Sequence, residues 1–233
     1  GGFDKDARLT QIMPEIGFGF MEVGSITHYP YEGNPGRRLV RLPQDQAIIV
    51  YYGLKNLGAE AIHKKIQRLT FRIPTAINIA KTNRVDIQGE QSIADYVHTY
   101  RLLRDQFAYA TINISCPNAQ DGCSLQDSPT LLHGLLAALQ REPKTVPVYI
   151  KISNDLNNSQ IDAILDIVQQ YSVINGFVVS NLAKQREHLQ LKSPAAMLNL
   201  LPAGGISGKP TEANSNHLIS YIYHATQGNY TII

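Results

Sequence analysis

The stretch Ala108-Tyr-Ala-Thr-Ile-Asn-Ile-Ser-Cys-Pro-Asn118 decides which fold class the chain is assigned to. Its first eight residues carry apolar and β-branched side chains on both faces, which is typical of a strand buried in a parallel sheet. Pro117 then ends the strand and begins a loop. In an α/β barrel the active-site residues lie at this junction, so Cys116 is the first candidate for chemistry.

Outward from this stretch, strand patterns and helix patterns alternate. Strands are expected at Phe18–Gly24, Ala76–Ile79, Ala108–Ser115, Val146–Ile152, Gly176–Ser180 and Tyr230–Ile233. Helices are expected where apolar residues recur every three or four positions. These positions are Leu57–Leu69, Ser92–Phe107, Leu131–Leu139, Ser159–Tyr171 and Ser215–Thr226.

Repeated strand–helix–strand units predict an α/β protein with a parallel sheet. A (β/α)8 TIM barrel needs about 250 residues, and this chain has 233. About seven strand positions are present if Gly1–Lys5 and Tyr230–Ile233 each contribute part of a strand. We therefore expect one domain over residues 1–233, an incomplete barrel without its last strand and with part of the first missing. A doubly wound open sheet is the alternative, but no G-x-G-x-x-G motif follows a predicted strand.

Composition excludes several classes of protein. Hydrophobic residues make up 43% and charged residues 17% of the chain, as in an ordinary globular protein. The net charge is only +2 without a basic block, so nucleic acid is not an expected partner. The two cysteines, Cys116 and Cys123, form neither a disulfide framework nor a zinc motif, and no metal site is expected. No apolar run approaches the ~18 residues of a membrane helix, and no signal peptide is visible.

Residues Ile26–Gln46 show little helix or strand pattern and are rich in proline and glycine. A long ordered loop after a barrel strand is usually functional.

Four residues suggest what the barrel could do. The Cys116 thiol, flanked by Asn113 and Asn118 as uncharged hydrogen-bonding groups, suits a base that removes a proton from a planar, polar substrate. The alternative for Cys116 is a buried free thiol without a function. Lys151 lies inside an apolar strand, where a charge needs a partner.

Taken in order, several segments resemble the dihydroorotate dehydrogenase family, the flavin enzymes of pyrimidine synthesis, and most closely its membrane-associated, quinone-using class. The segments are Gly2–Lys5, Gly17–Thr27, Glu32–Pro35, Arg41–Pro43, Asn113–Asn118, Gly204–Pro210 and Thr226–Gly228. The resemblance implies a barrel that binds FMN and oxidises dihydroorotate to orotate. It places the base that takes the C5 proton at Cys116, while hydride leaves C6 for the flavin, and it implies quinone as the electron acceptor.

The resemblance also assigns roles to residues near most of the predicted strand ends. The implied FMN contacts are Gly2, Lys5, Gly24, Ser25, Asn78, Asn113, Lys151, Ser180, Ser207 and Gly208. The implied substrate contacts are Lys5, Tyr52, Gly53, Leu54, Asn113, Asn118 and Asn181.

The chain departs from the family pattern at five positions. Cys116 stands where the quinone-using class has serine, and Leu54 stands where that class has phenylalanine. Val50 replaces a substrate-binding asparagine, a loss worth roughly 1–3 kcal/mol if it leaves a polar group unpaired. Leu182 replaces a threonine beside the substrate, and Cys123 replaces an arginine.

The resemblance places the glycine-rich turns for the flavin phosphate beyond Ile233, and a helical pair that docks on membranes before Gly1. We therefore expect a cytoplasmic protein, or one held peripherally on the inner face of the cell membrane by segments absent from this sequence. Two alternatives stay open. One is a related flavin enzyme acting on another dihydropyrimidine, and the other is a truncated barrel without catalytic activity.

Overall fold

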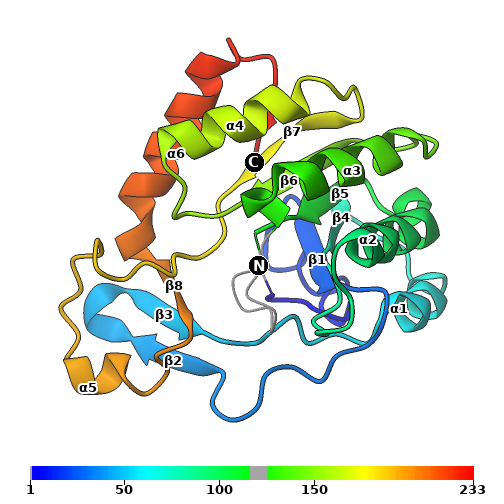
Figure 1. Ribbon diagram of the computed structural model, residues 1–233. Coiled ribbons are helices and arrows are strands. Elements are labelled where there is room, and N and C mark those ends of the chain that lie inside the picture. Colours follow the sequence, from blue (N-terminus) through cyan, green and yellow to red (C-terminus); the bar gives the residue numbers. More distant parts are fainter. Residues whose placement is uncertain (1, 116–124) are drawn as a thin grey trace.

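In the computed structural model, which describes residues 2–115 and 125–233, a six-stranded parallel sheet forms the centre (Figure 1). Its strands, in spatial order, are β1 (Met21–Ile26), β4 (Thr75–Ile79), β5 (Ala110–Asn113), β6 (Val148–Ile152), β7 (Ile174–Val179) and β9 (Thr231–Ile232). Neighbours in space are also successive along the chain, apart from the strands of a second sheet. Asp4 extends the series through a parallel bridge to Val23. This order is that of an incomplete (β/α)8 barrel, and the predicted fold class is confirmed.

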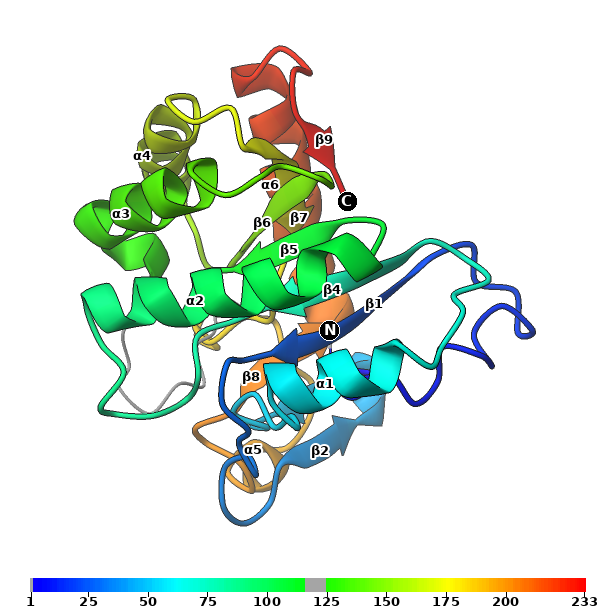
Figure 2. The same ribbon diagram turned by 90° about the vertical axis from the view of Figure 1, so that its right-hand side faces the viewer.

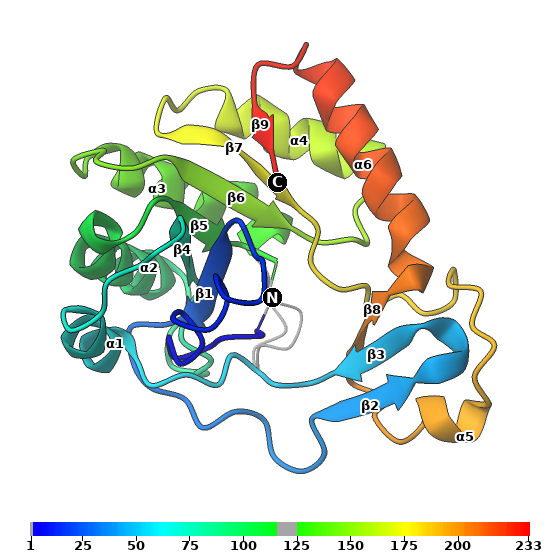
Figure 3. The same ribbon diagram turned by 180° about the vertical axis from the view of Figure 1, so that it is seen from behind.

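Helices follow the strands and lie on the outer side of the curved sheet (Figures 1 and 3). They are α1 (Ala59–Ile66), α2 (Glu90–Leu103), α3 (Pro129–Gln140), α4 (Asn158–Val168) and α6 (Glu212–Ala225). Figure 2 shows α1 and α2 beside β1 and β4. Side chains cap the starts of two of these helices. Ser128 Oγ accepts from the N–H of Leu131, and Asn157 and Gln160 form a capping box.

The core lies between the sheet and these helices. Val23, Ile77, Ile112, Ile150 and Phe177 come from five successive strands and are fully buried or nearly so. Burying each such side chain stabilises the fold by roughly 1.5–3 kcal/mol.

A smaller antiparallel sheet lies apart from the main one and was not predicted (Figure 1). It contains β2 (Leu39–Leu42), β3 (Ala47–Val50) and β8 (Gly205–Gly208), with a 3-10 turn at Pro43–Asp45 and the short helix α5 (Ala195–Leu198) nearby. The expectation that residues Ile26–Gln46 carry no strand is therefore wrong for the second half of that stretch. A four-residue strand has little pattern of its own. It forms here because β3 pairs with both β2 and the distant β8, and because Leu42, Ile49 and Ile206 bury one another.

No helix in the described parts of the chain is both long enough and apolar enough to cross a membrane.

Candidate functional site

Polar side chains gather where the parallel strands end, because the carboxyl ends of such strands meet at one edge. Gly24 of β1 is opposite Asn78 of β4, and Asn113 of β5 is opposite Lys151 of β6. We call Ser25, Asn78, Asn113, Lys151 and Asn181 the strand-end site. All five were predicted to contact FMN or the substrate.

A chain of hydrogen bonds joins four of these residues. Ser25 Oγ donates to Asn78 Oδ1 at 2.5 Å and accepts from Asn113 Nδ2 at 3.2 Å. Asn113 Oδ1 accepts from the backbone N–H of Ser115 at 3.3 Å and from Ser115 Oγ at 3.1 Å. Asn181 Nδ2 donates to Ser115 Oγ at 3.2 Å. Asn78, Asn113 and Ser115 are buried, so this network fixes the amides in place.

Gly24 has a structural reason to be glycine. Its φ is +129°, and a Cβ at this position would lie 2.5 Å from the carbonyl oxygen of Asn78. The close approach of β1 to β4 at the strand-end site therefore requires a residue without a side chain.

Lys151 places a buried ammonium at this site. The residue is 7% exposed, and among the described residues its Nζ has no hydrogen-bond or ion-pair partner. An ammonium that is withdrawn from water needs an acceptor or an anion nearby. An electron-rich ligand seated on the strand-end site would supply one, so the residues present fit a flavin or an orotate-like molecule.

Three other predicted residues come together at the amino end of the chain. Lys5 Nζ lies 5.2 Å from the centroid of the Tyr52 ring. A Cβ on Gly2 would lie 3.1 Å from Lys5 Nζ, so Gly2 is also adjacent. The structure therefore joins two segments, residues 2–5 and 52–54, that the resemblance assigned to cofactor and substrate.

The segment Tyr52–Leu54 is held by asparagines that sequence reasoning missed. Gly53 and Leu54 both have φ of +67°, and their carbonyls accept from Asn83 Nδ2 at 3.0 Å and Asn56 Nδ2 at 2.8 Å. Sequence could have indicated this role for Asn56 and Asn83 only weakly, through the general rule that asparagine is common at turns where the backbone has a positive φ.

Ser180 connects the end of β7 to the start of α6. Its Oγ accepts from Asn154 Nδ2 at 2.9 Å and lies 3.0 Å from Ser215 Oγ. Ser207 and Gly208 belong to β8, which ends just before α6. Gly208 has φ of +115°, and a Cβ there would lie 2.4 Å from the carbonyl oxygen of Gln46.

Three residues singled out from the sequence, Cys116, Asn118 and Cys123, lie outside the described residues.

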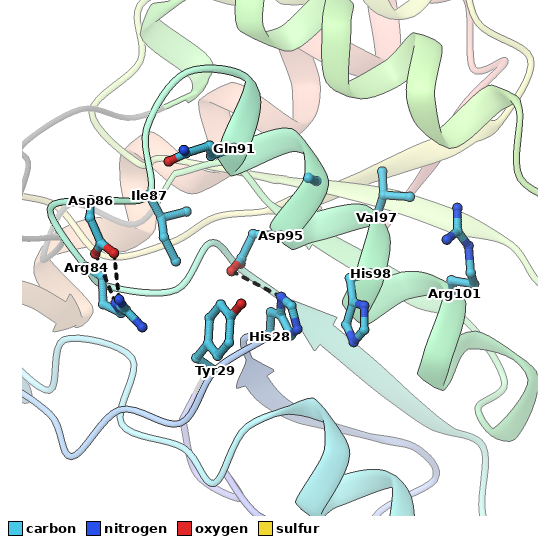
Figure 4. Close-up of a pocket in the computed structure, with 11 residues that line it drawn as sticks. His28, Tyr29, Arg84, Asp86, Ile87, Gln91, Asp95, Val97, His98 and Arg101 are labelled. Carbon is cyan, nitrogen blue, oxygen red and sulfur yellow. Dashed lines mark hydrogen bonds and ion pairs between the residues drawn. The ribbon is translucent and has the colours of Figure 1, made fainter.

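A cavity of about 670 Å³ lies between α2 and the loops that follow β1 and β4, and none of the predicted site residues that the structure describes lines it (Figure 4). In its wall the His28 ring stacks on the rings of Tyr29 and His98, with centroids 4.0 and 3.7 Å away. His28 Nδ1 lies 3.9 Å from the Asp95 carboxylate. Burial and the nearby His98 lower the pKa of His28, while Asp95 and Glu60 act in the opposite direction.

The model of the dihydroorotate dehydrogenase family matches residues 1–233. The chain belongs to the dihydroorotate dehydrogenase family. It is 40% identical over 235 residues to the dihydroorotate dehydrogenase (quinone) of Synechococcus sp. strain JA-3-3Ab. It is 37% identical over 239 residues to the enzyme of the same name from Trichodesmium erythraeum. Both alignments cover 100% of this chain but only 61% and 62% of the relatives, so the chain spans less than two thirds of their length.

Solved structures of the family have the same fold. The ligand-free dihydroorotate dehydrogenase of Eimeria tenella matches with a TM-score of 0.83 at 27% identity, over 100% of this chain and 70% of that one. The complex of the same enzyme with ferulenol matches with a TM-score of 0.82 at 26% identity, over 99% of this chain and 66% of that one. The family suggested by the sequence segments is therefore confirmed.

Proposed function

We propose that residues 1–233 form a single FMN-binding domain that oxidises dihydroorotate to orotate in pyrimidine biosynthesis, with quinone as the electron acceptor. The observation that carries the proposal is the strand-end site, where the buried Lys151 ammonium, which has no partner within residues 2–115 and 125–233, lies beside a fixed array of amides. The names of the relatives support the substrate and the acceptor.

FMN would be held by the residues that the resemblance assigned to it and that line the strand ends. Lys151, Asn78 and Asn113 offer N–H groups there, and Lys5 offers a second ammonium beside Tyr52. When bound, FMN supplies the acceptor for the hydride. The residues Ser180, Ser207 and Gly208 would contact it from the side of α6.

The residues of this chain would bind the substrate and remove its proton. Asn113 and Asn181, together with Asn118, would hydrogen-bond the alternating carbonyl and N–H groups of the pyrimidine ring. Cys116 would take the proton from C5. A thiol with an ordinary pKa near 8.5 forms its anion far more readily than the serine of the quinone-using class does. The ammonium groups of Lys5 and Lys151 would stabilise negative charge as it develops.

The choice of quinone as the electron acceptor determines where we propose that the protein acts. A quinone is dissolved in the membrane, so the proposal includes a cytoplasmic protein that contacts the membrane peripherally through parts of the protein outside this sequence.

The test is anaerobic addition of dihydroorotate to the purified chain loaded with FMN. The yellow oxidised-flavin absorbance should bleach, and Cys116→Ala should slow bleaching by about a hundredfold or more while the protein stays yellow. A yellow wild-type protein that does not bleach would falsify the activity. A colourless protein would favour a barrel fragment without catalysis.

A second candidate is a flavin enzyme acting on a dihydropyrimidine without a carboxylate, such as dihydrouracil. Val50 and Leu182, which replace polar residues of the family, both lie next to Gly205. Val50 pairs with Gly205 across the small sheet, and a Cβ on Gly205 would overlap the Leu182 side chain. Comparing the bleaching rates of the two substrates separates the candidates, since faster bleaching by dihydrouracil would replace the first one.

A further inference from the structure

Glu22 is a half-buried carboxylate on β1 that sequence reasoning did not assign to the site. Its Oε1 accepts from Asn78 Nδ2 at 2.7 Å, and its Oε2 accepts from Thr111 Oγ1 at 2.7 Å. It therefore joins three adjacent parallel strands below the strand-end site.

An ionised carboxylate can only accept hydrogen bonds, and this fixes the orientation of the next group. Asn78 must turn its Nδ2 toward Glu22, so its Oδ1 faces Ser25. Ser25 must then donate its only proton to Asn78 Oδ1. The Ser25 oxygen is left to accept, and it does so from Asn113 Nδ2.

The donor-to-acceptor direction of the hydrogen bonds stays the same from Asn113 to Asn181. Because Asn113 Nδ2 faces Ser25, its Oδ1 faces Ser115 and accepts from both the N–H and the hydroxyl of that residue. The Ser115 hydroxyl has then used its proton. Its oxygen accepts from Asn181 Nδ2, whose second N–H donates to the Ser115 carbonyl at 3.3 Å.

These hydrogen bonds leave different free groups on the side-chain amides of Asn113 and Asn181. Asn113 Oδ1 has both acceptor positions occupied, so Asn113 can offer a ligand only an N–H. Asn181 has both amide protons occupied, and its Oδ1 accepts one bond from the N–H of Leu182 at 2.9 Å. Asn181 can therefore offer a ligand only an oxygen.

We infer that Glu22 is a positioning residue that imposes the hydrogen-bond direction at the Asn78 end of the network, while the backbone of Ser115 and Leu182 imposes the same direction at the other end, so that a ligand meets Asn113 as a donor and Asn181 as an acceptor. The pattern suits a planar ring in which a carbonyl faces Asn113 and an N–H faces Asn181. The direction of the bonds follows from the structure alone, whereas the identity of that ligand rests on the proposed function. Glu22 also acts on Tyr109: burial is the main cause that raises the pKa of Tyr109, and the negative charge of Glu22 is the next largest cause.

The first experiment uses the wild-type chain and needs no ligand. NMR scalar coupling across the hydrogen bond should connect Asn78 Nδ2 to the carboxylate carbon of Glu22, and Asn113 Nδ2 should not couple to a carbonyl carbon. A coupling pattern with the Asn78 amide reversed overturns the inference. Because this experiment uses only the wild-type chain, its result does not depend on whether any variant folds.

The second experiment compares Glu22→Gln with Thr111→Val. Glutamine keeps the shape but can donate, so Glu22→Gln no longer imposes the direction at Asn78. The side-chain amide signals of Asn78 and Asn113 should shift or double, and orotate should bind about tenfold more weakly or worse. Thr111→Val removes one donor but keeps the carboxylate, so its amide signals should match those of the wild type. Unchanged amide signals in Glu22→Gln overturn the inference, whereas a wild-type chain with the expected coupling that does not bind orotate counts only against the proposed function.

Discussion

At the scale of single residues, the strand-end site consists of amides, the Ser25 hydroxyl and one buried ammonium, and the Glu22 carboxylate accepts from the amide of Asn78. Asn78, Asn113 and Lys151 lie within the last three residues of a predicted strand and Asn181 directly follows one, and parallel strands bring their ends together, so the sequence indicated which side chains gather but not how they are bonded. The role of Glu22 could not be predicted in this way. Its importance comes from two hydrogen bonds to neighbouring strands that have no signature in local sequence.

The buried ammonium of Lys151 leads to a prediction about the free energy of unfolding. Replacing it by the apolar side chain of similar length in Lys151→Met removes a buried charge that has no partner among the described residues. The free energy of unfolding of the FMN-free chain should increase by about 1 kcal/mol, while affinity for FMN falls. Urea unfolding and FMN titration measure the two effects.

The matched control is Lys64→Met, on the exposed face of α1. It should change neither quantity. If Lys151→Met destabilised the free chain and left FMN affinity unchanged, Lys151 would be a structural residue rather than part of a ligand site.

At the scale of elements, prediction succeeded where the pattern is local. The strands β4, β5, β6 and β7 carry their own apolar runs, and the helices carry apolar residues at helical spacing. The small sheet was missed because β3 and β8 are more than 150 positions apart in the sequence. Its pairing depends on contacts that no window of neighbouring residues contains.

The capping box of α4 gives a prediction at this scale. Asn157 Oδ1 accepts from the N–H of Gln160 at 3.0 Å, and Gln160 Oε1 accepts from the N–H of Asn157 at 2.9 Å. Asn157→Ala removes the acceptor for the N–H of Gln160 but keeps the backbone N–H that donates to Gln160 Oε1, and it should cost about 1 kcal/mol of stability. For a chain of this size the melting temperature should fall by about 2–4 °C.

Gln169→Ala at the other end of the same helix is the control, because that side chain makes no hydrogen bond to the described residues. A thermal melt in which both variants lose equal stability would mean that shortening any polar side chain at a helix end, rather than losing the cap, determines the result.

At the scale of the whole molecule, the His28 stack joins the loop after β1 to α2, and the charge of Glu60 on α1 also acts on it (Figure 4). The folded state lowers the pKa of His28 by burial and by the neighbouring His98, against the pull of Asp95 and Glu60. Below the ordinary pKa of about 6.5 the unfolded chain therefore binds a proton that the folded chain resists. This makes the free energy of unfolding decrease as the pH falls from about 7 through the folded pKa of His28.

The test is urea unfolding of the wild type and of His28→Asn between about pH 5 and pH 7.5. Burial raises the pKa of Asp95. The folded chain therefore binds a proton at Asp95 more readily than the unfolded chain does, so this carboxyl group makes the free energy of unfolding increase as the pH falls, opposite to the effect of His28. The informative quantity is consequently the difference in pH slope between the two proteins. His28→Asn should lose less stability on acidification than the wild type, whereas His188→Asn at an exposed position should match the wild-type slope. Parallel slopes for the wild type and His28→Asn would show that His28 does not cause the acid destabilisation, which then arises elsewhere in the protein.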